Sequence, residues 1–259
     1  TMLRMVLQNW GALNSAVTRF PGEQLGAWYP DTFDYVLLDA PCSMQNLRST
    51  EARPMQSISD RERQMLSGRQ ERLLFSDLQA LKVGGQVVYS TCTLEPEEDE
   101  AVLDAVLRQT GGAVQLVETA SRIGRAAPGL ACAEIAGQVQ KFDPQVVYAV
   151  RLWPHIFGTS GFFAVLLTKQ DATGGERQAF QQKASMPRGL KSLKPKEARA
   201  VLNQLEQNYG FDFSPVMSSQ GLSLWRNREV LYAIPYAWWE NFAQLPFQAV
   251  GMRIAEEDR

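Results

Sequence analysis

FDYVLLDAPCS (residues 33–43) decides the fold class of this chain. Its centre, YVLL, is a short continuous apolar run, which is typical of a strand buried on both faces of a parallel sheet. A second such run, QVVYSTC (residues 86–92), also ends in a cysteine. Between the two runs, apolar residues recur at helical spacing from about residue 60 to residue 82, and Gly84-Gly85 is expected to end that helix.

The order strand, helix, strand predicts a right-handed crossover within a mostly parallel sheet. If the two strands are neighbours, their ends lie about 5 Å apart. Ligands bind outside the carboxyl ends of such strands. We therefore expect Asp39, Cys42 and Cys92 to converge on one crevice, although Cys42 and Cys92 are 50 residues apart in the chain.

The remaining pattern predicts an α/β domain over residues 1–170. A helix opens the chain, and EPEEDEAVLDAVLRQTGG (residues 95–112) is a helix with an acidic first turn and glycines past its end. AVQLVE (residues 113–118) and GFFAVLLTK (residues 161–169) are later strands, and residues 121–150 are expected to be rich in loops.

A small second domain is predicted after a polar linker at residues 171–190. Residues 191–259 contain a helix from Pro195 to near Gly210, then two short strands around a turn at residues 226–229. Aromatic residues between 225 and 247 either form the core of this α+β domain or stack on bases, and the core interpretation is favoured.

Composition and charge exclude several classes of protein. No apolar run approaches the ~18 residues that span a membrane, and the first residues lack the pattern of a secretory signal. Three cysteines and one histidine form neither a disulfide framework nor a zinc-ligand spacing, so we expect a cytoplasmic protein without a metal. Residues 183–199 carry six basic residues against one acid, which suits either phosphate contact or a solvated linker.

The two cysteines at strand ends are open to two interpretations. A buried thiol is commonly a small hydrophobic group, whereas a thiolate is a strong nucleophile. An acid beside two thiols suits substitution at carbon 5 of a pyrimidine. In that reaction a thiolate adds to carbon 6, an acid stabilises ring nitrogen 3, and a second thiol assists release after methyl transfer.

FDYVLLDAPCS, LKVGGQVVYSTCTLEPEEDE and RLWPH followed by SGFFAVLLTK resemble successive motifs of the Sun-type RNA cytosine 5-methyltransferases. The resemblance covers roughly residues 1–170. Residues 190–259 are similar, more weakly, to the RNA-binding PUA-like region of bacterial RsmF-type ribosomal RNA methyltransferases. The fold implied is a partial Rossmann-like methyltransferase domain followed by a PUA-like domain at residues 191–259, which could itself be truncated.

The resemblance implies a role for each motif residue. It assigns the nucleophile to Cys92, the releasing thiol to Cys42, and contact with the cytosine edge to Asp39. The donor would be S-adenosylmethionine, with Asp39 and Pro41 as the donor contacts in this chain. The implied partner is RNA, with ribosomal RNA favoured over transfer RNA, and the candidate RNA-binding residues are Arg48, Lys191, Lys194 and Lys196.

The chain departs from this family in two places. A Gly-rich donor loop and the acid that follows it in the family are not found ahead of residue 33, so we expect the chain alone to be inactive. Met44 and Asn46 stand where the family has glycines. A decayed or truncated RNA-binding protein is therefore the alternative hypothesis, and a thiol redox protein ranks last because the chain has no C-x-x-C motif.

Overall fold

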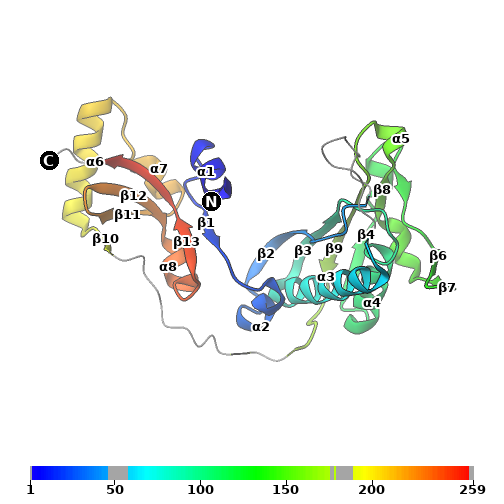
Figure 1. The fold of residues 1–259 in the computed structure, drawn as a ribbon. Helices are drawn as coiled ribbons and strands as arrows, with labels where there is room; N and C mark the ends of the chain where they lie inside the picture. Colours follow the sequence, from blue (N-terminus) through cyan, green and yellow to red (C-terminus); the bar gives the residue numbers. More distant parts are fainter. Residues whose placement is uncertain (1, 46–57, 176–177, 179–188, 257–259) are drawn as a thin grey trace. The chain divides into compact units, whose positions relative to one another are not determined.

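The computed structural model describes residues 2–45, 58–175, 178 and 189–256 (Figure 1). The chain forms two compact units. We call residues 21–179 the central unit, and residues 1–20 with 180–259 the terminal unit. Each unit is described by itself. No helix among the described residues has both the length and the apolar character needed to cross a bilayer.

A six-stranded sheet organises the central unit, in the order β2-β3-β9-β8-β5 with β4 also pairing with β9. Its strands are β2 (Phe33–Asp39), β3 (Leu81–Thr91), β4 (Val114–Val117), β5 (Ala127–Pro128), β8 (Val150–Leu152) and β9 (Phe162–Lys169). Strands β2 and β3 are parallel neighbours, as predicted. The other pairs are antiparallel: β9 runs against β3, β4 and β8, and β5 runs against β8. The expectation of a mostly parallel sheet is therefore wrong for the described strands.

Two helices cover one face of this sheet. Helix α3 (Asp60–Ala80) connects β2 to β3, and α4 (Glu100–Thr110) follows β3 and packs beside α3. A capping box between Ser59 and Glu62 starts α3. Leucine and valine side chains of both helices join inward-facing residues of β3, β4 and β9 in one apolar core. Burial of this face is the main source of stability for the unit.

Strand β2 differs from its prediction. One of its faces packs on the core through Val36 and Leu38, but Tyr35 and Leu37 on the other face are 77% and 73% exposed. In the described part of the chain β2 is the edge strand of its sheet. The expectation that β2 is buried on both faces is therefore wrong in this structure.

The end of α3 also differs from the prediction. The helix stops at Ala80, and Gly84-Gly85 lies inside β3. Gly84 has a φ of +84°, and a Cβ atom on Gly85 would come within 3.0 Å of the Asp34 carbonyl oxygen in β2. These glycines therefore allow β2 and β3 to approach each other closely where the register of their pairing shifts.

Short elements fill the region that was expected to be rich in loops. Strands β6 (Cys132–Ile135) and β7 (Gln138–Lys141) form a hairpin, and Cys132 is exposed. The other short elements of the central unit are η1 (Gly22–Gln24), α2 (Leu25–Trp28), η2 (Ala120–Arg122), η3 (Pro144–Tyr148) and α5 (Pro154–Phe157).

The terminal unit contains an antiparallel sheet in the order β10-β11-β12-β14. Its elements are α1 (Met2–Asn9), β1 (Ala16–Thr18), β10 (Leu190–Ser192), α6 (Pro195–Tyr209), α7 (Ser214–Ser219), β11 (Leu222–Asn227), β12 (Val230–Pro235), α8 (Tyr236–Phe242), β13 (Phe247–Val250) and β14 (Met252–Glu256). The predicted helix from Pro195 and the two strands around residues 226–229 are confirmed. Trp225 and Trp238 are buried in an apolar cluster, as the core interpretation expected, whereas Trp239 is 40% exposed.

The first residues of the chain lie in a different unit from the one that the sequence suggested. Residues 1–20 group with residues 180–259, because β1 pairs with β13 and Gly251 donates its backbone N–H to Ser15. The sequence analysis placed residues 1–170 together. The assignment of the units to a methyltransferase domain and a PUA-like domain stays a prediction.

Candidate functional site

The carboxyl ends of β2 and β3 bring the two motif cysteines together. The strands are in register with Asp39 opposite Ser90, so Cys42 and Cys92 both follow the strands at one edge of the sheet. The two sulfur atoms are 3.1 Å apart, and either thiol can donate a hydrogen bond to the other. The predicted proximity of these cysteines is confirmed. Both side chains are half-buried.

The Cys42 thiol is a weaker acid than an ordinary cysteine thiol. Burial, followed by the neighbouring thiol of Cys92, raises the pKa of Cys42 to about 12. Cys42 is therefore a protonated thiol at neutral pH. A group of this kind can donate or accept a hydrogen bond, but it is a poor nucleophile.

Asp39 lies at the end of β2 and its side chain is exposed. It is on the same face of the strand as Tyr35 and Leu37, because side chains alternate along a strand. Pro41 is half-buried between Asp39 and Cys42. Its carbonyl oxygen accepts a hydrogen bond from Gln70 at 2.8 Å.

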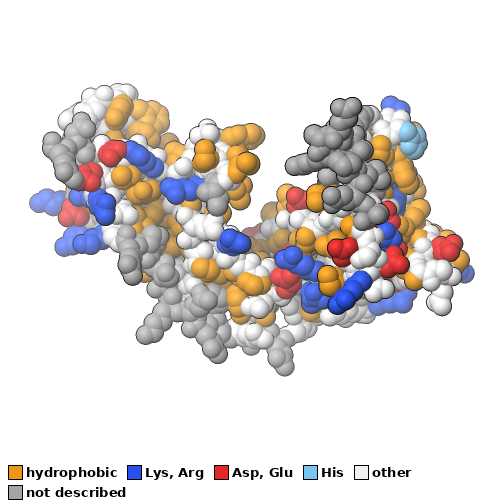
Figure 2. Space-filling model, viewed as in Figure 1, with side chains coloured by type: hydrophobic (Ala, Val, Ile, Leu, Met, Phe, Trp, Pro, Cys, Tyr) orange, Lys and Arg blue, Asp and Glu red, His pale blue; other side chains and the backbone are white. Residues whose placement is uncertain are grey.

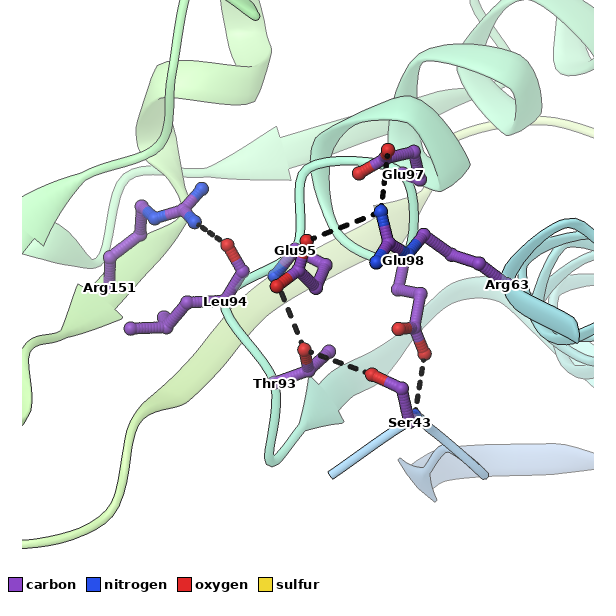
Figure 3. A network of polar contacts seen from close by, with 8 residues as sticks. All are labelled: Ser43, Arg63, Thr93, Leu94, Glu95, Glu97, Glu98 and Arg151. Carbon is purple, nitrogen blue, oxygen red and sulfur yellow. Dashed lines mark hydrogen bonds and ion pairs between the residues drawn. The ribbon is translucent and has the colours of Figure 1, made fainter. Parts of the chain in front are cut away.

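Glu98, a buried acid before α4, is linked to the residues that directly follow the two cysteines, Ser43 and Thr93 (Figure 3). Glu98 is fully buried, and its Oε2 accepts a hydrogen bond from the Ser43 backbone N–H at 2.8 Å. The Ser43 hydroxyl group donates to the Thr93 hydroxyl group at 3.3 Å. The residues that follow Cys42 and Cys92 are therefore tied to each other and to Glu98.

A buried ion pair fixes the chain after Cys92. Arg151 in β8 pairs with Glu100 and also donates to the Leu94 carbonyl oxygen, and both charged side chains are at most 1% exposed. Asp99 accepts a hydrogen bond from the Thr91 hydroxyl group at 2.6 Å, and burial raises the pKa of Asp99 well above its ordinary value. Arg151 therefore carries the charge that balances Glu100.

These acids were missed as site residues by the sequence analysis. It assigned the run from Glu97 to Glu100 to the first turn of a helix, but Glu98, Asp99 and Glu100 are buried and α4 begins only at Glu100. Glu97 is half-buried and forms an ion pair with Arg63. The sequence held one signal, since four consecutive acids at the start of a core-packed helix cannot all face water.

Three of the four candidate RNA-binding residues lie in the terminal unit. Lys191, Lys194 and Lys196 are exposed on the terminal unit, and Figure 2 shows Lys and Arg side chains gathered around β10 and α6. Lys191 and Lys194 border a groove of about 1090 Å³. Its charged lining consists of Lys191, Lys194, Arg226, Arg228, Glu197, Glu229 and Glu256. Arg48 lies outside the described residues, as does Asn46.

Within the described ranges, no group of three or more His, Cys, Asp or Glu residues is arranged to hold a metal ion.

Comparisons with known proteins identify the family of the chain. The family model described as 16S rRNA methyltransferase RsmB/F matches residues 1–168. Ribosomal RNA small subunit methyltransferase F of Aeromonas salmonicida (strain A449) is 30% identical over 250 residues, which are 96% of this chain and 48% of that protein. Its counterpart in Klebsiella pneumoniae (strain 342) is 29% identical over 255 residues, which are 98% of this chain and 49% of that protein. The chain thus spans about half the length of these curated relatives.

Solved structures show the same fold. A methyltransferase homologue from Pyrococcus horikoshii is similar with a TM-score of 0.52 and 31% identity, over 64% of this chain and 48% of that chain. NSun6 from Pyrococcus horikoshii, solved with SFG, has a TM-score of 0.50 and 23% identity, over 65% of this chain and 38% of that chain. The matched region is therefore a mixed α/β fold with methyltransferases as its structural neighbours.

Proposed function

The chain belongs to the 16S rRNA methyltransferase RsmB/F family, and we propose that its neighbouring thiols serve methylation of cytosine carbon 5 in ribosomal RNA. The contact between the Cys42 and Cys92 sulfur atoms at the ends of two parallel strands carries this proposal. The RsmF relatives favour ribosomal RNA as the substrate. Because the chain spans about half of their length, the activity and substrate of the whole protein are proposals.

The roles proposed for the two cysteines are those that the family resemblance implies. Cys92 is the proposed nucleophile, which forms a bond from its sulfur to carbon 6 of cytosine while an acid protonates or hydrogen-bonds ring nitrogen 3. Asp39, exposed at the end of β2, is the proposed acid. After methyl transfer a base removes the proton from carbon 5, and the bond between sulfur and carbon 6 breaks. Cys42, protonated because its pKa is about 12, is the proposed thiol that assists release.

S-adenosylmethionine is the proposed donor, and the described residues fit only a part of it. The exposed carboxylate of Asp39 and the neighbouring Pro41 can contact a donor at the end of β2. A carboxylate there suits the cationic or N–H groups of such a ligand. The donor supplies an electrophilic methyl group when bound.

The terminal unit is the proposed RNA-binding part, with a PUA-like role. Lys191, Lys194 and Lys196 are exposed beside a groove that backbone phosphates could occupy. This role does not depend on the chemistry of the cysteines. RNA binding without methylation would therefore support the alternative of a catalytically decayed RNA-binding protein.

A covalent-trapping experiment tests the proposal with the protein at its natural length. RNA containing 5-fluorocytidine blocks the final elimination, so a protein–RNA adduct should accumulate. We expect Cys92→Ala to abolish the adduct and lower methylation by about 1,000-fold or more, whereas Cys42→Ala keeps the adduct. The adduct is measured by denaturing gel electrophoresis, with Cys132→Ala as the matched control. An adduct that persists in Cys92→Ala would show the nucleophile to be wrongly assigned.

A further inference from the structure

Two buried side chains hold the residues on either side of Cys42. Gln70 in α3 donates from Nε2 to the Pro41 carbonyl oxygen at 2.8 Å, and Glu98 accepts from the Ser43 N–H at 2.8 Å. The same Gln70 nitrogen donates to Glu98 Oε2 at 3.1 Å. We call these two residues the Gln70–Glu98 pair. It joins both peptide neighbours of Cys42 to the body of the central unit.

Both members of the pair are buried, with 0% of each residue exposed. Their hydrogen bonds use Gln70 Nε2 and Glu98 Oε2, while Oε1 of each side chain has no hydrogen-bond partner among the described residues. The Tyr89 hydroxyl group donates to the Glu98 backbone carbonyl oxygen at 2.6 Å, which links the turn before α4 to β3. Pro41 to Ser43 lie beyond the end of β2, so no strand ladder holds these residues. Side-chain hydrogen bonds therefore take the place of a ladder around Cys42.

We propose that the Gln70–Glu98 pair positions the Cys42 thiol against the Cys92 thiol and thereby sets the rate of product release. This inference rests on the proposed roles of the two cysteines. The hydrogen bonds of Gln70 and Glu98 go to the neighbours of Cys42 and not to either sulfur atom, so both are positioning residues. Their effect should appear in the step that needs Cys42 and be small in the step that needs only Cys92.

A chemical test on this chain measures the positioning directly. In a Cys132→Ser background, diamide takes up two electrons and two protons from Cys42 and Cys92, so its azo bond becomes a hydrazine and one disulfide forms. We expect Glu98→Leu and Gln70→Leu to slow this intramolecular disulfide formation by about tenfold, because each removes hydrogen bonds to the Cys42 segment. Mass spectrometry of trapped samples gives the rate.

Two variants control the experiment. Glu98→Gln keeps an acceptor oxygen for the Ser43 N–H and should react at the parental rate. Glu97→Leu changes the neighbouring acid, whose side chain pairs with Arg63 instead, and should also react at the parental rate. Equal rates in Glu98→Leu and Glu97→Leu would overturn the proposal. If Glu98→Leu does not fold, as judged by circular dichroism, Gln70→Leu decides the question by the same measurement.

A kinetic test then separates positioning from general structural damage. With ordinary cytosine RNA and the protein at its natural length, the pair's variants should slow decay of the covalent intermediate by about tenfold, while adduct formation changes less than about twofold. General damage would lower both rates together and contradict the proposal. If the parent protein forms no adduct, the proposed function is wrong. The positioning of Cys42 is still tested by the diamide rates, because these are measured without RNA.

Discussion

Met44 adopts the left-handed backbone conformation two residues after Cys42, with a φ of +56°. This region disfavours residues with a Cβ atom by roughly 1–2 kcal/mol. The Met44 side chain is 55% exposed, so little packing offsets that cost. The sequence resemblance expected a glycine at this position, and the backbone observed here is one that glycine adopts without strain.

We therefore expect Met44→Gly to raise the free energy of unfolding by about 1 kcal/mol, since relief of strain exceeds the added entropy of the unfolded chain. Chemical denaturation of the central unit measures this change. Met65→Gly is the matched control, because Met65 is exposed within α3 and should lose about 1 kcal/mol on the same substitution. A loss of stability in Met44→Gly comparable to that in Met65→Gly would contradict the strain argument.

Helix α3 carries a buried acid on the face that packs against the core. Asp77 is 6% exposed, and burial raises its pKa to about 7. The folded state therefore favours the protonated acid, whereas the unfolded chain ionises near the ordinary value of 3.8. Asp77 therefore makes its full contribution to the free energy of unfolding below pH 3.8, where it is protonated in both states. That contribution is lost as the pH rises to about 7.

Asp77→Asn should remove this loss. We expect the variant to be more stable than the parent at pH 8, by on the order of 2–4 kcal/mol, and to lack the decline between about pH 4 and pH 7. Urea denaturation at a series of pH values measures the difference. Asp60→Asn, at an exposed position of the same helix, should keep the parental decline because it retains Asp77. An unchanged pH profile in Asp77→Asn would refute the assignment.

The distribution of the chain between two units is a property of the whole molecule. Strand β1 contributes Ala16, Val17 and Thr18 as pairing partners of β13, and the Thr18 hydroxyl group donates to the Pro246 carbonyl oxygen at 3.0 Å. Val250 in β13 is only 8% exposed. The terminal unit therefore depends on residues from both ends of the sequence.

Removal of residues 1–20 should expose β13. In residues 21–259 we expect amide hydrogen exchange of Phe247–Val250 to accelerate by about tenfold or more, because the ladder to β1 is lost. The internal control is β11, whose partners β10 and β12 remain. Unchanged protection of β13 would show that the pairing adds no stability.

Local pattern predicted much of this protein. Continuous apolar runs located β2 and β3, apolar periodicity located α3, and end signals such as proline and glycine located α4 and α6. Two strand-end motifs identified Cys42 and Cys92 as neighbours. These features depend on the spacing of adjacent side chains and on short connections. The residues that predict each helix or strand therefore lie within that element or next to it.

Tertiary structure alone decided the rest. Whether Glu98 faces water or the core depends on where the turn before α4 meets α3 and β3, and that packing requires residues far apart in the chain. The exposed face of β2 and the antiparallel course of β9 likewise depend on which strands lie beside them. Burial and pairing are set by distant partners, so the sequence near Cys42 indicated a reactive thiol but not the Gln70–Glu98 pair that holds it in place.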